Sequence, residues 1–151
     1  MPHLVIYYTP NLDRETDMTA LCRSLADTML AVRDEEGKQV FPIGGTRVLA
    51  YPAAHYAVSD GGAAGRAANT HSGAASGDPG DYAFVYLNLR MGRGRTGATH
   101  KKVGDALLLT TKSHFQVLFT QRHIGITLQI DEGPEVFDAK NSSLHPLFKK
   151  P

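Results

Sequence analysis

The sequence predicts an α/β (α+β) fold in which two consecutive βαβ units form one four-stranded sheet with two helices on one face. Two observations support this prediction. Short β-branched and aromatic segments alternate with two long segments of helical periodicity, in the order strand, helix, strand, twice over. The two units, residues 2–53 and 81–132, have equal lengths and are separated by a glycine- and alanine-rich insert, residues 54–80. Because 151 residues is a common size for one domain and residues 133–151 form only a tail, we expect a single domain over residues 1–151.

The first unit is predicted to run from a strand through an amphipathic helix to a second, parallel strand. Residues 3–8, HLVIYY, are β-branched and aromatic and end at a turn-forming TPN, as is typical of a strand. Residues 13–32 carry apolar side chains at helical spacing, and Asn11 or Asp13 is expected to cap this helix. The predicted buried stripe is Met18, Leu21, Cys22, Leu25 and Met29. Residues 46–51, TRVLAY, predict the second strand.

The second unit repeats this order after the insert. The insert, residues 54–80, contains six of the fifteen glycines and no sustained periodicity, so we expect a flexible insert or lid without regular structure. Residues 81–91 alternate like a strand, residues 97–119 are predicted to be helical, and residues 124–130 alternate as the last strand. The predicted buried stripe of this helix is Val103, Ala106, Leu107, Thr110, His114 and Leu118.

Both faces of the strand at residues 81–91 are rich in apolar or aromatic side chains. One face carries only aliphatic residues and is expected to pack on the helices. The other face carries Tyr82, Phe84 and Tyr86, and no remaining segment of the chain is available to cover it. Because a large exposed apolar face usually marks an interface, we expect the protein to be an oligomer.

The composition excludes several classes of protein. Sixteen Lys and Arg balance fifteen Asp and Glu, which argues against a protein that coats nucleic acid. A single cysteine, Cys22, cannot form an internal disulfide, and no apolar run approaches the length of a bilayer span. The first residues do not resemble a secretory signal, so we expect a cytoplasmic protein with no membrane partner. The seven histidines show no metal-binding spacing, so no metal is expected.

Residues 92–97, GRGRTG, match the dinucleotide-binding pattern G-x-G-x-x-G, but their context does not fit. No acidic residue lies about 20 positions further on, and the preceding strand carries Asn88 and Arg90 instead of a wholly apolar sequence. We therefore interpret these glycines as a tight turn that places Arg93 and Arg95 at the mouth of the sheet. The same arginines also leave open a basic-loop module that binds a partner without catalysis.

Pro2 is a candidate catalytic residue. Methionine is usually removed before a small residue, so the mature chain is expected to begin with the secondary amine of Pro2. In an apolar pocket beside cations, both burial and charge would lower the pKa of such an amine below the ordinary 7.7–8.0 of an α-amino group. The amine would then be an uncharged base at neutral pH.

Several segments resemble the 5-carboxymethyl-2-hydroxymuconate isomerase family of the tautomerase superfamily. These are Pro2-His3 at the start of a strand, FPIGGTR at 41–47, DYAFVYLNLRMGRGR at 81–95, KSHF at 112–115 and NSSLHPLFK at 141–149. The resemblance implies two βαβ units assembled as a homotrimer, with active sites near the subunit boundaries. It implies that Pro2 is the base, that Arg47 and Arg95 bind the substrate, and that no cofactor is used.

The implied reaction moves a proton between oxygen and carbon of an unsaturated 2-hydroxy or 2-keto di- or tricarboxylic acid. A neutral amine with a pKa near the working pH suits such a proton shuttle. The two arginines would share carboxylate binding and stabilisation of the enolate. Tyr7 stands where family members commonly have glutamate, and Leu49 stands where some have a second arginine, so both departures are expected to affect specificity. The alternatives are a proline-dependent hydratase or dehalogenase, and a non-catalytic oligomeric scaffold.

Overall fold

The computed structural model describes residues 2–68 and 81–148, arranged as a layer of helices on a four-stranded sheet. The strands are β1 (His3–Tyr8), β2 (Arg47–Pro52), β3 (Tyr82–Met91) and β4 (His123–Glu132). Their order is β2-β1-β3-β4, with β1 parallel to β2, β3 parallel to β4, and β1 antiparallel to β3. The two predicted parallel pairs are therefore confirmed, and the sheet is mixed because the two units meet through antiparallel central strands.

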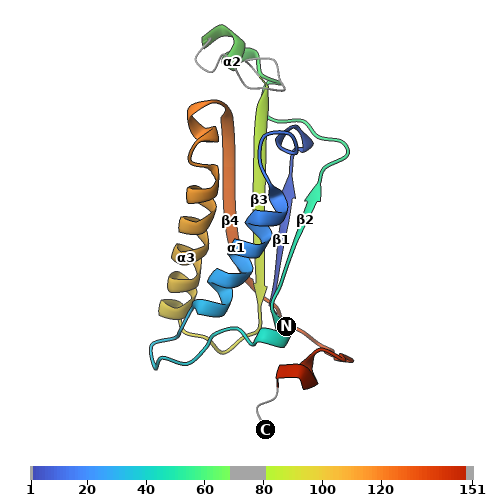
Figure 1. Cartoon of the computed structure of the whole chain (residues 1–151), viewed down its shortest axis with the longest axis vertical. Helices are drawn as coiled ribbons and strands as arrows, with labels where there is room; N and C mark the ends of the chain where they lie inside the picture. The colour runs from blue at the N-terminus through green and yellow to red at the C-terminus, as the bar shows by residue number, and fades with distance from the viewer. Residues whose placement is uncertain (1, 69–80, 149–151) are drawn as a thin grey trace.

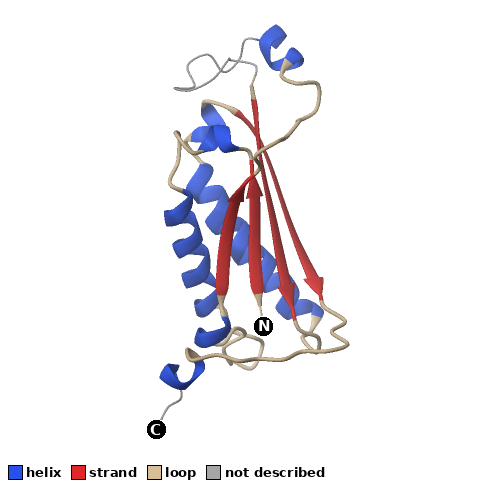
Figure 2. Ribbon diagram, turned by 90° about the vertical axis from the view of Figure 1, so that its right-hand side faces the viewer, coloured by secondary structure: helices blue, strands red, loops and turns tan. Residues whose placement is uncertain are grey.

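Helices α1 (Met18–Ala31) and α3 (Gly97–Phe115) lie side by side on one face of the sheet, as predicted (Figure 1; Figure 2). The core lies between these helices and the inward side chains of β1 and β3. The strands contribute alternate residues, Leu4, Ile6 and Tyr8 from β1 and Ala83, Val85, Leu87, Leu89 and Met91 from β3. The opposite face of the sheet is left open by the described residues (Figure 2). None of the described helices combines the length and the hydrophobicity that crossing a lipid bilayer requires.

The cap and the buried stripe of α1 differ in part from the prediction. Asp17 caps the helix by accepting a hydrogen bond from the backbone N–H of Ala20 at 2.9 Å, so the predicted capping role of Asn11 or Asp13 was wrong. Asn11 instead bonds Asp81 and the carbonyl of Tyr82, and Asp13 accepts from the Tyr8 hydroxyl. Cys22 is only half-buried at the edge of the stripe, where burial raises the pKa of its thiol.

Helix α3 is shorter than predicted, and its buried stripe lies one residue further along the chain at its C-terminal end. Thr111 and Phe115 are buried, whereas Thr110 and His114 lie at the edge of the core. Nε2 of His114 is 2.7 Å from Oγ1 of Thr16, and burial lowers the pKa of this imidazole. The buried residues Val103, Leu107, Thr111 and Phe115 are spaced four apart, and α3 packs against α1 as well as against the sheet, a contact that periodicity alone does not specify.

The insert contains regular structure that the sequence analysis did not predict. Residues Ala63–Ala68 form the short helix α2, beyond the end of the sheet (Figure 1). Asp60 accepts hydrogen bonds from the backbone N–H groups of Gly62 and Ala64, and these and other hydrogen bonds lower the pKa of its carboxyl. The N–H of Gly65 donates to the Tyr82 hydroxyl at 3.0 Å, which attaches α2 to β3. The rest of the predicted insert, residues 69–80, lies outside the described residues.

Candidate active site

Pro2 lies buried immediately before β1, against the turn Ile43–Gly45. A Cβ added to Gly45 would lie 3.7 Å from Cδ of Pro2 and 3.0 Å from Cγ of Pro42. The backbone of Gly45 therefore passes close beside the Pro2 ring, and the neighbouring Pro42 leaves little room for a larger residue at position 45. The sequence predicted Pro2 at the start of the first strand. The structure shows in addition that its ring packs against the turn that contains Gly45.

The C-terminal tail packs on the other side of this turn. A Cβ on Gly44 would lie 3.1 Å from Cδ2 of Phe148 and 3.2 Å from Cδ2 of His145, both in the short helix His145–Phe148. Gly44 and Gly45 are both buried, so the turn lies between the tail and Pro2. The sequence analysis predicted the tail but gave it no position, because contacts between segments about 100 residues apart leave no periodic pattern.

Arg47 is the first residue of β2 and lies near Pro2 through the strand register. The Cα of Arg47 is paired with that of His3, the residue that follows Pro2. The Arg47 side chain is half-buried, and its Nη1 donates to the carbonyl of Gly45 at 3.1 Å. The turn beside the Pro2 ring thus also binds the guanidinium of Arg47.

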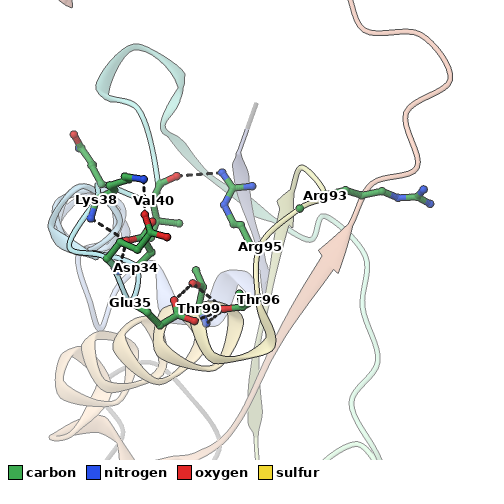
Figure 3. A pocket seen from close by; sticks show the side chains of 11 residues that line it. Asp34, Glu35, Lys38, Val40, Arg93, Arg95, Thr96 and Thr99 are labelled. Atoms are coloured by element: carbon green, nitrogen blue, oxygen red, sulfur yellow. Dashed lines mark hydrogen bonds and ion pairs between the residues drawn. The ribbon is translucent and has the colours of Figure 1, made fainter.

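Arg95 lies in the turn between β3 and α3. Gly94 has φ +95°, a left-handed conformation that favours glycine, which agrees with the tight turn predicted from GRGRTG. Nη1 of Arg95 donates to the carbonyl of Gly92 at 2.7 Å and Nη2 to that of Val40 at 3.1 Å, and the guanidinium lies 5.8 Å from the Phe41 ring centroid. These contacts hold Arg95 half-buried at the same end of the sheet as Pro2, whereas Arg93 is exposed and points away (Figure 3).

A cavity of about 530 Å³ opens beside Arg95, between the loop that follows α1 and the start of α3 (Figure 3). Its wall includes three acidic residues, Asp34, Glu35 and Glu36, and neither Pro2 nor Arg47 lines it. Glu35 accepts hydrogen bonds from the hydroxyls of Thr96 and Thr99, and these bonds lower the pKa of its carboxyl. This cavity is therefore not a pocket that encloses all three predicted site residues, although all three lie at one end of the sheet.

Two basic residues near Pro2 were not assigned to the site from the sequence. His3 is paired with Arg47 on β2 and with Arg90 on β3. Burial, and then the positive charges of Arg47 and Arg90, lower the pKa of His3. No sequence motif assigns His3 or Arg90 to the site, because only the register between strands places them next to Arg47.

Tyr7 and Leu49 lie on the open face of the sheet. The Tyr7 ring is 5.9 Å from that of Tyr51, and the side chains of Tyr7 and Leu49 are 53% and 43% exposed. Within the described residues, no group of three or more histidine, cysteine, aspartate or glutamate side chains is placed to hold a metal ion.

Comparison with known proteins identifies the family of the chain. The sequence profile of the 5-carboxymethyl-2-hydroxymuconate isomerase family matches residues 2–148. The chain belongs to this family. An Escherichia coli 5-carboxymethyl-2-hydroxymuconate Delta-isomerase is 26% identical over 149 residues, which are 99% of this chain and 100% of that protein. The resemblance seen in the sequence is thus confirmed.

Solved structures of isomerases from this family show the same fold. A crystal structure of a 5-carboxymethyl-2-hydroxymuconate delta-isomerase is 56% identical, with a TM-score of 0.91 over 100% of this chain and 95% of that chain. A 5-carboxymethyl-2-hydroxymuconate isomerase from Deinococcus radiodurans R1 is 32% identical, with a TM-score of 0.76 over 99% of this chain and 95% of that chain. The site described above lies within the part of the chain shared with these isomerases.

Proposed function

We propose that the chain is a cofactor-independent 5-carboxymethyl-2-hydroxymuconate isomerase with Pro2 as its proton-transferring group. After removal of Met1, the neutral secondary amine of Pro2 takes the proton of the substrate's 2-hydroxyl group. A dienolate forms, and the same nitrogen returns the proton to a carbon of the conjugated chain. One O–H bond breaks and one C–H bond forms, so no oxidant or reductant is needed. One base that serves both steps is efficient when its pKa lies near the working pH.

Arg47 and Arg95 supply the positive charge that this mechanism needs. The dienolate carries negative charge on oxygen in addition to the substrate's carboxylates, and a guanidinium can bind either group through two parallel hydrogen bonds. The observation that carries the proposal is the packing of Pro2 on a turn whose Gly45 carbonyl also binds Arg47. In the mature chain, the burial of Pro2 and the positive charge of Arg47 on the neighbouring strand would both disfavour a proton on the amine.

Turnover of the named substrate and the mass of the mature chain test this proposal together. We expect the purified protein to convert 5-carboxymethyl-2-hydroxymuconate to its keto isomer. The reaction is monitored by the loss of the substrate's ultraviolet absorbance, and a chelator should leave its rate unchanged. Intact-mass spectrometry should show a chain without Met1. An active enzyme that retains Met1 would exclude the Pro2 amine. An inactive protein without Met1 would favour the scaffold, and water or halide chemistry on related acids would favour the hydratase or dehalogenase.

We propose that the active protein is a homotrimer that covers the open face of the sheet. The exposed Tyr7, Leu49 and Tyr51 lie on this face, and the cavity beside Arg95 leaves out Pro2 and Arg47. A second copy could close the site at the subunit boundary.

Sedimentation velocity measures this assembly directly. We expect a mass three times the 16.4 kDa of one chain. The variant Tyr51→Glu should sediment as a monomer, because it places a charge in the covered face, where Tyr51 is paired with Tyr7. The matched variant Thr19→Glu, on the exposed side of α1, should stay trimeric. A monomeric wild-type protein that turns over substrate would contradict the trimer.

A further inference from the structure

A row of basic side chains crosses the open face of the sheet next to Pro2. The strand register pairs His3 with Arg47 on one side and with Arg90 on the other. Directly paired residues in a sheet point to the same face, and successive residues point to opposite faces. Since Leu4 is buried under the helices, His3 and both arginines lie on the open face. Arg47, His3 and Arg90 therefore lie side by side on the open face. His3, in the middle of this row, directly follows Pro2 in the chain.

Arg90 is exposed and forms no ion pair within the described residues. Across residues 2–68 and 81–148, no ion pair joins its guanidinium to a carboxylate. Asp131 is its register partner on β4, but Oδ2 of Asp131 accepts a hydrogen bond from Asn88 at 2.7 Å. The Arg90 guanidinium is therefore exposed and forms no ion pair in this part of the chain, so it can bind an anion from outside the chain in competition with the nearby Asp131 and Glu135.

The segment after β4 positions the Arg90 side chain. The N–H of Gly133 donates to the carbonyl of Met91 at 3.0 Å, which brings this segment across the end of β3. A Cβ on Gly133 would lie 2.8 Å from Nε of Arg90 and 2.6 Å from Oε1 of Glu135. The absence of a side chain at Gly133 thus gives the guanidinium its space, with Glu135 nearby as the group that a bound anion would have to displace or tolerate.

The substrate in the family's name has one more carboxylate than the proposed mechanism has arginines. Muconate is a six-carbon diacid, and the carboxymethyl group adds a third carboxylate. We propose that Arg90 binds one of the two carboxylates remote from the 2-hydroxyl group and so selects triacids over di- and monoacids. This assignment rests on the proposed function, in which Arg47 and Arg95 share the binding of a carboxylate near the 2-hydroxyl group and of the enolate oxygen.

The spacing of the row suits this role. Adjacent strands lie about 4.8 Å apart, so the backbones of Arg47 and Arg90 are separated by about 10 Å, with His3 between them. A planar substrate lying across these strands can reach guanidiniums on both sides, each of which can bind a carboxylate through two hydrogen bonds. His3, kept neutral by burial and by its cationic neighbours, can donate one further hydrogen bond between them.

Binding of unreactive analogues tests Arg90 without relying on the chemistry. The probes are 2-(carboxymethyl)hexanedioate, a saturated triacid with the carbon skeleton of the substrate, and hexanedioate, which lacks the third carboxylate, both titrated into the full chain by calorimetry. We expect the wild-type protein to bind the triacid roughly 10-fold more tightly than the diacid. The variant Arg90→Ala should lose this preference, Arg90→Lys should keep part of it, and Arg93→Ala should keep all of it. A preference that survives in Arg90→Ala, or is absent from the wild type, would overturn the proposal.

Kinetics separate a binding role from a structural one. With 5-carboxymethyl-2-hydroxymuconate, Arg90→Ala should raise KM by roughly 10-fold and leave kcat within about 2-fold of the wild type. With phenylenolpyruvate, a monoacid enol, both constants should stay within about 2-fold. Equal losses on both substrates would mean that Arg90 only supports the fold. If Pro2 proves not to be the base while the calorimetric preference still depends on Arg90, then the proposed mechanism fails and the carboxylate subsite stands.

Discussion

Replacing Pro2 with alanine should lower kcat for the ketonisation of phenylenolpyruvate by about 10²-fold or more, within the range that a general base contributes. The mature variant still begins with an amine, but this amine lacks the ring that packs beside Gly45 and fixes the direction of the nitrogen. The secondary structure should stay unchanged, because β1 begins only at His3. The measurement is stopped-flow absorbance, with circular dichroism as the test of folding.

A second variant removes the amine itself. A lysine inserted between Met1 and Pro2 prevents removal of the methionine, so the Pro2 nitrogen becomes an amide without basicity. We expect turnover to fall by up to about 10⁴-fold, the upper range for loss of acid–base catalysis. The matched control inserts alanine at the same place, which permits removal of Met1 but still places an amide at Pro2, and it should be equally inactive. Activity near the wild-type rate in either insertion variant would show that Pro2 is not the base.

The second large effect is expected at Arg95, where Arg95→Ala should lower kcat/KM by about 10²- to 10³-fold, as loss of a preorganised donor to a developing oxyanion does. The same change leaves the carbonyls of Gly92 and Val40 without their charged donor. The free energy of unfolding should therefore also fall, by about 1–3 kcal/mol. Urea unfolding and steady-state kinetics measure the two effects separately.

Arg93→Ala is the matched control for Arg95→Ala. Arg93 lies two residues away in the same turn and borders the cavity, but its side chain is exposed and points away from Arg95 (Figure 3). It should change the free energy of unfolding by no more than about 0.5 kcal/mol and leave kcat/KM near the wild-type value. Arg95→Lys, which keeps the charge but not the planar fork, should fall between wild type and Arg95→Ala. A folded Arg95→Ala variant with kcat/KM near that of wild type would contradict the assigned role.

The elements of the fold were predictable because each one carries a local pattern. The alternation in residues 82–91 and the helical spacing of Leu21, Leu25 and Met29 are both found in the structure. The predictions that were wrong depend on neighbouring elements. Asp17 caps α1 in place of Asn11 or Asp13, which instead form hydrogen bonds to other segments. Similarly, α2 docks through the hydroxyl of Tyr82, a contact that the composition of the insert does not reveal.

The candidate site divides in the same way. The sequence pointed to Pro2, Arg47 and Arg95 through motifs, and their roles remain proposals. It did not point to Arg90, because the antiparallel pairing of β1 with β3 is what places Arg90 beside His3. Nor did it give the tail a place, although Phe148 and His145 pack on the turn that supports Pro2.

The sequence by itself determined the strands, the two long helices and the family, because backbone periodicity and short motifs are properties of neighbouring residues. Only the tertiary structure decided which charged side chains share one face and that the Val40 carbonyl binds Arg95. It also decided that the C-terminal tail packs beside Gly44. Such contacts join residues tens of positions apart. They arise from burying one side of the sheet beneath two helices, which fixes the register and the ends of every strand together.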